Sequence, residues 1–185
     1  PLRGGNLKKF SSLAAASLLA CGTVLAGCAT HIKAPDQPNQ PSPVHFKNFA
    51  RVTIAPLKVE RSGKDSGDQA AAKRIGDQLT ACMQQVFPQL NKTDVGGKEL
   101  TIEPAIVDLK KVNTSERIWL GPMAGSSAVV LKTVYKDAAS GKVIVEPLFY
   151  ARAEAFGGGA TFGATDNMML NRVTEDACGY AKSNL

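Results

Sequence analysis

The feature that most constrains this chain is an apolar segment near its start, because it removes part of the sequence from the fold. Lys8 and Lys9 precede an apolar run from Phe10 to Ala26 that ends in small residues. This order is typical of a secretory signal that is cut off after export. A retained membrane span is one alternative, but it needs about 20 apolar residues, and a signal cut elsewhere is another. We predict that residues 1–27 form a signal peptide.

The segment Leu25-Ala26-Gly27-Cys28 at the end of this signal resembles the lipobox of bacterial lipoproteins. The resemblance implies cleavage between Gly27 and Cys28, a diacylglycerol group on the Cys28 sulfur and an acyl chain on its new amine. Ala29 stands where an Asp tends to retain lipoproteins in the inner membrane of enteric-type bacteria. The resemblance therefore implies a lipid anchor in the outer membrane, facing the periplasm, with the inner membrane less favoured.

Length and charge limit what the mature chain can be. Removing 27 of the 185 residues leaves 158, which is enough for one domain with a core and too few for two. The net charge falls from +6 to about +3, because Arg3, Lys8 and Lys9 leave with the signal. Acids and bases are mixed along the remaining chain, so it lacks the basic footprint of a nucleic-acid-binding protein.

Residues 28–45 are predicted to be a lipidated N-terminus and a proline-rich tether. The segment is polar and carries Pro35, Pro38, Pro41 and Pro43. This composition favours extended, solvated backbone and cannot build a core. Such a tether would hold the domain up to about 45 Å from the bilayer.

Residues 46–185 are predicted to form a single periplasmic α+β domain with the order β-α-β-β-β-α. Strands are expected at residues 51–56, 100–112, 127–136 and 142–154, and helices from about residue 69 to Val86 and from Thr165 or Asp166 onward. Pro104 within the second strand demands an edge position or a bulge. The Asp137–Gly141 turn predicts an antiparallel hairpin. We expect a mainly antiparallel sheet of about four strands with both helices on one face.

The four cysteines have different expected fates. Cys21 leaves with the signal and Cys28 is lipidated, so Cys82 and Cys178 remain as an even pair in an oxidising compartment. Cys82 lies on the apolar stripe of the first helix, with Ile75, Leu79, Met83 and Val86. Two helices on one face would bring it near Cys178. We predict a disulfide, and the alternative is two separately buried thiols.

The sequence offers no clear catalytic set. Its two histidines, His31 and His45, both precede the folded domain, which argues against a hydrolytic triad. The remaining cysteines lack CxxC spacing, so we expect no zinc or other metal site. Residues 157–163 are rich in glycine but match no phosphate-binding motif, and we expect no cofactor beyond the acyl groups on Cys28. Scattered carboxylates such as Asp108, Glu146 and Glu175 are expected to be solvated surface charges.

The only tryptophan, Trp119, belongs to a candidate partner-contact patch with Ile118, Leu120 and Met123. An exposed apolar patch of this kind suits a protein partner or a membrane. The alternative is that Trp119 closes one end of the core.

The folded part resembles small, uncharacterised bacterial lipoproteins that are grouped as domains of unknown function. The matching features are residues 100–108, the Asp137–Lys142 turn and the glycine-rich segment before the last helix. The resemblance implies a periplasm-facing lipoprotein and carries no catalytic residues. We expect a non-enzymatic interaction module of the cell envelope with an unidentified protein partner. Binding of a small ligand or lipid is the alternative, and an enzyme that uses carboxylates is a third.

Overall fold

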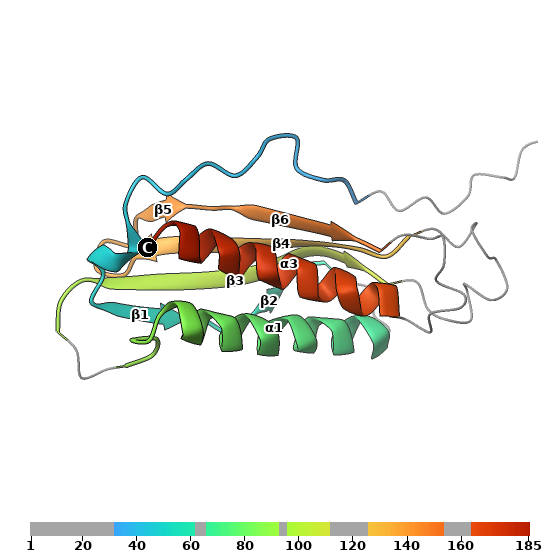
Figure 1. Ribbon diagram of the computed structural model, residues 1–185, viewed down its shortest axis with the longest axis horizontal. Coiled ribbons are helices and arrows are strands. Elements are labelled where there is room, and N and C mark those ends of the chain that lie inside the picture. The colour runs from blue at the N-terminus through green and yellow to red at the C-terminus, as the bar shows by residue number, and fades with distance from the viewer. Residues whose placement is uncertain (1–31, 62–65, 93–95, 112–125, 154–163) are drawn as a thin grey trace, which may run out of the picture.

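The computed structural model describes residues 32–61, 66–92, 96–111, 126–153 and 164–185. In these residues a six-stranded mixed sheet carries two helices on one face (Figure 1). The elements, in chain order, are the 3-10 helix η1 (Phe46–Asn48), β1 (Arg51–Ile54), β2 (Lys58–Val59), α1 (Ser66–Val86), β3 (Glu99–Lys110), β4 (Ala128–Asp137), β5 (Val143–Val145), β6 (Leu148–Arg152) and α3 (Ala164–Ser183).

The α+β class and the two helices are confirmed, but the sheet differs from the prediction. We expected about four antiparallel strands, and the sheet has six strands of mixed direction. β1 and β2 both pair in parallel with β3, whereas β4 pairs antiparallel with β3, β5 and β6. The parallel pairing arises because α1 connects β2 to β3, and a helical crossover returns the chain in the same direction.

Pro104 lies on a central strand, not on an edge strand. β3 pairs with β4 on one side. On the other side it pairs first with β1 and then with β2, and there is a gap between these two short strands. Ala55 N donates to Ile102 O and Glu60 N donates to Ile106 O, each at 2.8 Å, so Pro104 falls between these two bonds. The missing N–H of the proline therefore faces the interruption and costs the sheet no hydrogen bond.

The predicted hairpin is confirmed, although its second strand is broken into β5 and β6 at Glu146 and Pro147. In the turn, Asp137 Oδ1 accepts hydrogen bonds from the N and Oγ of Ser140, each at 2.9 Å. These bonds hold the pKa of the Asp137 carboxyl below its ordinary value. Gly141 has φ +67°, which glycine adopts without strain.

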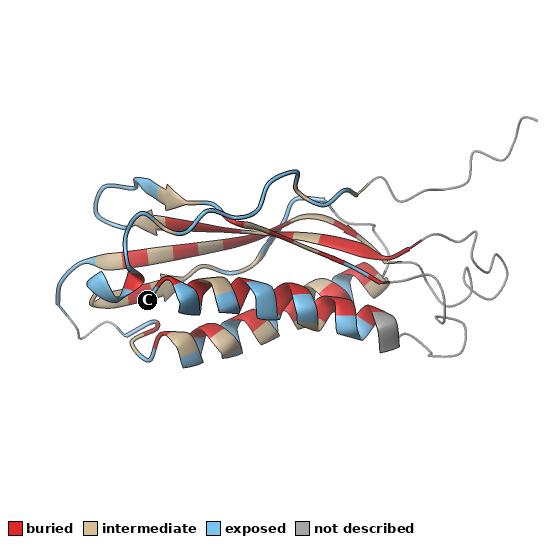
Figure 2. Ribbon diagram, turned by 45° about the horizontal axis from the view of Figure 1, so that its top comes forward, coloured by how far each residue is buried: buried red, intermediate tan, exposed pale blue. Residues whose placement is uncertain are grey.

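The core lies between the sheet and the two helices, where buried residues gather (Figure 2). The predicted stripe of α1 is confirmed, since Ile75, Leu79 and Met83 are fully buried and Cys82 and Val86 are half-buried. The buried apolar residues of α3 are Met169, Leu170, Val173, Ala177, Cys178 and Ala181. Both helices thus use one apolar face each to cover the same face of the sheet.

Two glycines are expected to respond oppositely to alanine. Gly97 has φ +114°, and a Cβ there would lie 2.9 Å from Ala50 Cβ. Gly97→Ala should lower the free energy of unfolding by about 2 kcal/mol, because strain and crowding add. Gly179 lies in α3 with open space around it, so Gly179→Ala should raise that free energy by about 1 kcal/mol. Urea denaturation of both variants checks this, and changes of the same sign would contradict it.

Candidate functional site

Most residues that the sequence singles out for function lie outside the described residues. They are Gly27 and Cys28 of the predicted cleavage and lipidation site, and Ile118, Trp119, Leu120 and Met123 of the predicted partner patch. Their roles therefore stay predictions. The predicted disulfide lies inside the described part of the chain.

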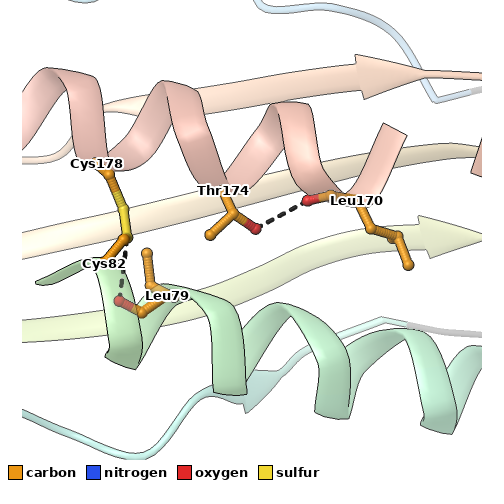
Figure 3. The surroundings of a disulfide bond; sticks show 5 residues. All are labelled: Leu79, Cys82, Leu170, Thr174 and Cys178. Atoms are coloured by element: carbon orange, nitrogen blue, oxygen red, sulfur yellow. Dashed lines mark hydrogen bonds between the residues drawn. A yellow bond between two sulfur atoms is a disulfide. The ribbon is translucent and has the colours of Figure 1, made fainter. Parts of the chain in front are cut away.

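Cys82 of α1 and Cys178 of α3 form that disulfide, so the prediction is confirmed (Figure 3). Their Cα atoms are 6.2 Å apart, within the usual range for a disulfide, and the bond joins residues 96 positions apart. Cys82 is half-buried, whereas Cys178 is only 9% exposed. The disulfide ties the two helices together at one point along their contact.

A polar seam continues from the disulfide along the line where the helices meet. We call this line the interhelical seam: Arg74, Gln78 and Cys82 of α1, and Asn167, Asn171, Thr174 and Cys178 of α3. Arg74 donates to Oδ1 of Asn167 at 3.0 Å and to Oδ1 of Asn171 at 3.2 Å. Gln78 Nε2 donates to the same Asn171 oxygen at 2.8 Å. Residues that come later in α1 contact residues that come later in α3, so the two helices run parallel.

A groove of about 350 Å³ opens in the seam beside the disulfide. It is lined by Gln78, Cys82, Asn171, Thr174, Glu175 and Cys178. Thr174 Oγ1 donates to Leu170 O of its own helix at 2.8 Å, so this hydroxyl is already satisfied (Figure 3). Glu175 is the one carboxylate among these lining residues.

A second cleft, of about 280 Å³, lies where the sheet edge is interrupted. We call it the edge cleft. It is lined by Ile54, Ala55, Pro56, Leu57, Gly76, Asp77, Leu79, Thr80, Asn91 and Pro104. Asp77 is its one carboxylate among these residues, and Lys73 Nζ lies 2.6 Å from Asp77 Oδ2. The cleft is therefore mostly apolar, with a polar rim supplied by α1 and Asn91.

The face of the sheet turned away from the helices, here called the open face, carries ion pairs that cross between strands. Lys136 Nζ lies 2.7 Å from Glu103 Oε2, and this bond holds the pKa of the Glu103 carboxyl below its ordinary value. Lys132 pairs with Glu60 at 3.4 Å. Further along the strands, Arg51 pairs with Glu99. Partly exposed pairs of this kind stabilise a sheet only weakly.

One end of the open face carries two positive charges. Ala128 of β4 is in register with Lys110 of β3 and with Arg152 of β6, so the two cations flank it in one row. Arg152 donates to Ser126 Oγ at 2.7 Å. Neither cation forms an ion pair with another described residue.

Residues 39–45, here called the N-terminal strap, lie along the β5–β6 edge of the sheet (Figure 1). Asn39 Nδ2 donates to Leu148 O, and Leu148 N donates to Asn39 Oδ1, each at 2.8 Å. The side-chain amide of Asn39 therefore occupies the outward backbone groups of β6 as a neighbouring strand would.

Two further contacts fix the strap to α3 and its C-terminal end. Tyr180 OH donates to Gln40 O at 2.7 Å, and Ser42 N donates to Asn184 Oδ1 at 2.7 Å. Partial burial raises the pKa of the Tyr180 phenol. The strap residues are mostly exposed and form no helix or strand, which agrees with the predicted tether. Their attachment to the domain was not predicted from the sequence.

Asn39→Ala should loosen the strap without unfolding the domain. We expect the free energy of unfolding to fall by about 1 kcal/mol, the usual net value for lost hydrogen bonds. Hydrogen exchange at Leu148 should become faster, because its N–H loses its acceptor. Hydrogen-exchange mass spectrometry checks this, with Gln37→Ala as the control just outside the strap. Unchanged exchange at Leu148 would contradict the role given to Asn39.

The described residues bring together no metal-binding cluster. No group of three or more His, Cys, Asp or Glu within them is placed to hold a metal ion. His45 Nδ1 lies 3.0 Å from Leu185 O, and His45 lines neither of the two clefts. No described helix is both long and apolar enough to cross a membrane.

Comparison with known proteins finds only distant structural similarity. No family model and no curated protein matches the chain. One similar solved structure is the PelC dodecamer from Paraburkholderia phytofirmans, with 9% identity, a TM-score of 0.47, and coverage of 77% of this chain and 94% of that chain.

Two others come from different bacteria. Protein XCC0632 from Xanthomonas campestris, of family DUF330, has 12% identity, a TM-score of 0.43 and coverage of 82% and 95%. Lipoprotein GNA1162 from Neisseria meningitidis has 12% identity, a TM-score of 0.35 and coverage of 69% and 96%. With all three TM-scores below 0.5, the likeness is too distant to carry a function to this chain.

Proposed function

We propose that this chain is a lipid-anchored lipoprotein on the periplasmic face of the outer membrane, and that it acts as a non-enzymatic interaction module of the cell envelope. The N-terminal strap is the observation that carries this proposal. It holds the chain from Asn39 onward, so only the ten residues 29–38 separate the predicted anchor at Cys28 from the domain. That length spans at most about 40 Å. The domain would stay close to the bilayer and to its neighbours there.

The chemistry of the two clefts supports a non-enzymatic role. The groove beside the disulfide offers Glu175 and the edge cleft offers Asp77, so each has a single carboxylate among its described lining residues. Acid–base work by carboxylates uses a pair whose environments separate their pKa values. Neither cleft supplies such a pair or a histidine from the described residues.

The open face is the proposed contact surface for a protein partner with an acidic patch. Both helices cover the opposite face, and one end of the open face carries Lys110 and Arg152, neither of which forms an ion pair with another described residue. Charge complementarity of this kind steers association and selects partners. The partner itself is unidentified.

Photo-crosslinking in cells tests this proposal. A crosslinking amino acid at Tyr150, which lies on the open face beside Val130, should capture an envelope protein. The same amino acid at Gln84, exposed on α1, is the control and should not capture it. The double variant Lys110→Glu and Arg152→Glu should abolish capture. If no specific envelope protein is captured at native abundance, the proposal fails.

The edge cleft favours a second candidate, the binding of a small apolar ligand or lipid. Its volume of about 280 Å³ approaches that of small-molecule sites, and its walls are mostly apolar. Native mass spectrometry of the Cys28→Ser chain should then recover an apolar ligand. Thr80→Trp should fill the cleft and remove that ligand, and a ligand-free wild-type chain would contradict this candidate.

A further inference from the structure

We propose that the Cys82–Cys178 disulfide is a thiol-exchange site of the folded protein, where a dithiol reductant enters the groove between α1 and α3 and attacks Cys82 Sγ. The groove of about 350 Å³ is lined by both cysteines. Access of a thiolate to a sulfur is one of the factors that set the rate of exchange. A disulfide at the wall of an open groove has that access without unfolding of the domain.

Burial distinguishes the two sulfur-bearing residues. Cys82 is half-buried, whereas Cys178 is only 9% exposed. The incoming thiolate therefore meets Cys82 first. Attack at Cys82 Sγ makes Cys178 the leaving group.

The reduced form of Cys82 already has a hydrogen-bond acceptor. Its Sγ lies 3.3 Å from Leu79 O, one turn earlier in α1 (Figure 3). In the disulfide the sulfur carries no hydrogen, but the thiol formed on reduction can donate to this carbonyl without movement of the helix. The side chains of Arg74, Gln78 and Asn171 bond the helices independently of the disulfide. The domain therefore remains folded when the disulfide opens.

The exchange balances with a dithiol as the reductant. One thiolate of the reductant bonds to Cys82 Sγ, the Cys82–Cys178 bond breaks, and Cys178 leaves as a thiolate that takes up a proton. The second thiolate of the reductant then attacks the reductant sulfur that is bonded to Cys82. This attack releases Cys82 as a thiolate, which also takes up a proton. The reductant is oxidised to a disulfide, and the protein gains two thiols.

Charge in the groove provides a matched pair of variants. The Glu175 carboxylate lines the groove and repels an incoming thiolate, whereas the neighbouring Asp176 is exposed outside it. Glu175→Lys should therefore speed reduction more than Asp176→Lys, which makes the same change of charge. The difference should shrink at high ionic strength, because salt screens exposed charges.

Reduction kinetics of the mature protein in native buffer test the proposal, with dithiothreitol as the probe and mass spectrometry of the Cys82 and Cys178 peptides as the readout. We expect a rate proportional to dithiothreitol and unchanged by about 1 M urea. We expect Glu175→Lys to raise it about threefold at low salt. With the monothiol glutathione in place of dithiothreitol, the exchange should stop at a mixed disulfide between glutathione and Cys82.

Three results would overturn the proposal. A rate that reaches a plateau with dithiothreitol, or that rises with urea as global unfolding does, would show that the disulfide opens only in the unfolded chain. Glutathione trapped on Cys178 would reverse the assignment of the attacked sulfur. Equal effects of Glu175→Lys and Asp176→Lys would place the route of attack outside the groove.

Discussion

Replacement of Cys28 by Ser should move the protein from the membrane fraction to the soluble fraction and leave the domain folded. The acyl groups predicted on Cys28 contribute about 0.8 kcal/mol for each buried CH₂, so several chains together make membrane attachment stable. Serine offers no sulfur for that modification. Fractionation of cells, with circular dichroism of the released protein, measures both parts of the result.

Cys21→Ser is the matched control for this variant. Cys21 lies in the predicted signal and would be discarded with it, so its replacement should leave the protein at the membrane. If the Cys28→Ser protein stays membrane-bound after its signal has been cut, the predicted lipid anchor is wrong.

Loss of the disulfide is the second large effect that we expect. Replacing both Cys82 and Cys178 by Ala should lower the free energy of unfolding by about 4 kcal/mol, because a crosslink between residues 96 apart restricts the unfolded chain. Small domains have a total of about 5–15 kcal/mol, so the variant should fold with a much smaller margin. Urea denaturation followed by circular dichroism should show a clearly lower midpoint.

The dependence on urea gives this prediction an internal check. Without the crosslink the unfolded chain expands, so the slope of the free energy against urea should increase. Wild-type protein unfolded in reductant should approach the behaviour of the double variant. A midpoint equal to that of the oxidised wild type would mean that the disulfide adds nothing to stability.

The sequence predicted the parts of the fold that local patterns determine. The helical spacing of Ile75, Leu79 and Met83 identified the buried face of α1, and the Asp137–Gly141 turn identified the hairpin. The direction of β1 and β2 was missed, because strand direction depends on how the chain crosses the sheet and not on local composition. A strand followed by a helix and another strand is the pattern that could have indicated parallel pairing.

The candidate sites were less predictable, with one exception. The even pair Cys82 and Cys178 indicated the disulfide, because the number of cysteines and the compartment together limit their pairing. The polar side of α1, with Arg74 and Gln78 before Cys82, was not recognised as a helix contact because polar positions are normally exposed. The N-terminal strap was missed since its bonds go largely to backbone atoms, which leave no residue pattern.

The interruptions of the sheet have a consequence for how the chain behaves among copies of itself. A long free edge is a template on which another chain can add a strand and aggregate. Here one edge is divided between β1 and β2, at Pro56, and the other between β5 and β6, at Pro147. Asn39 also occupies the outward groups of Leu148. Folded copies that collect on a membrane would thus present one another with only short stretches of unpaired backbone.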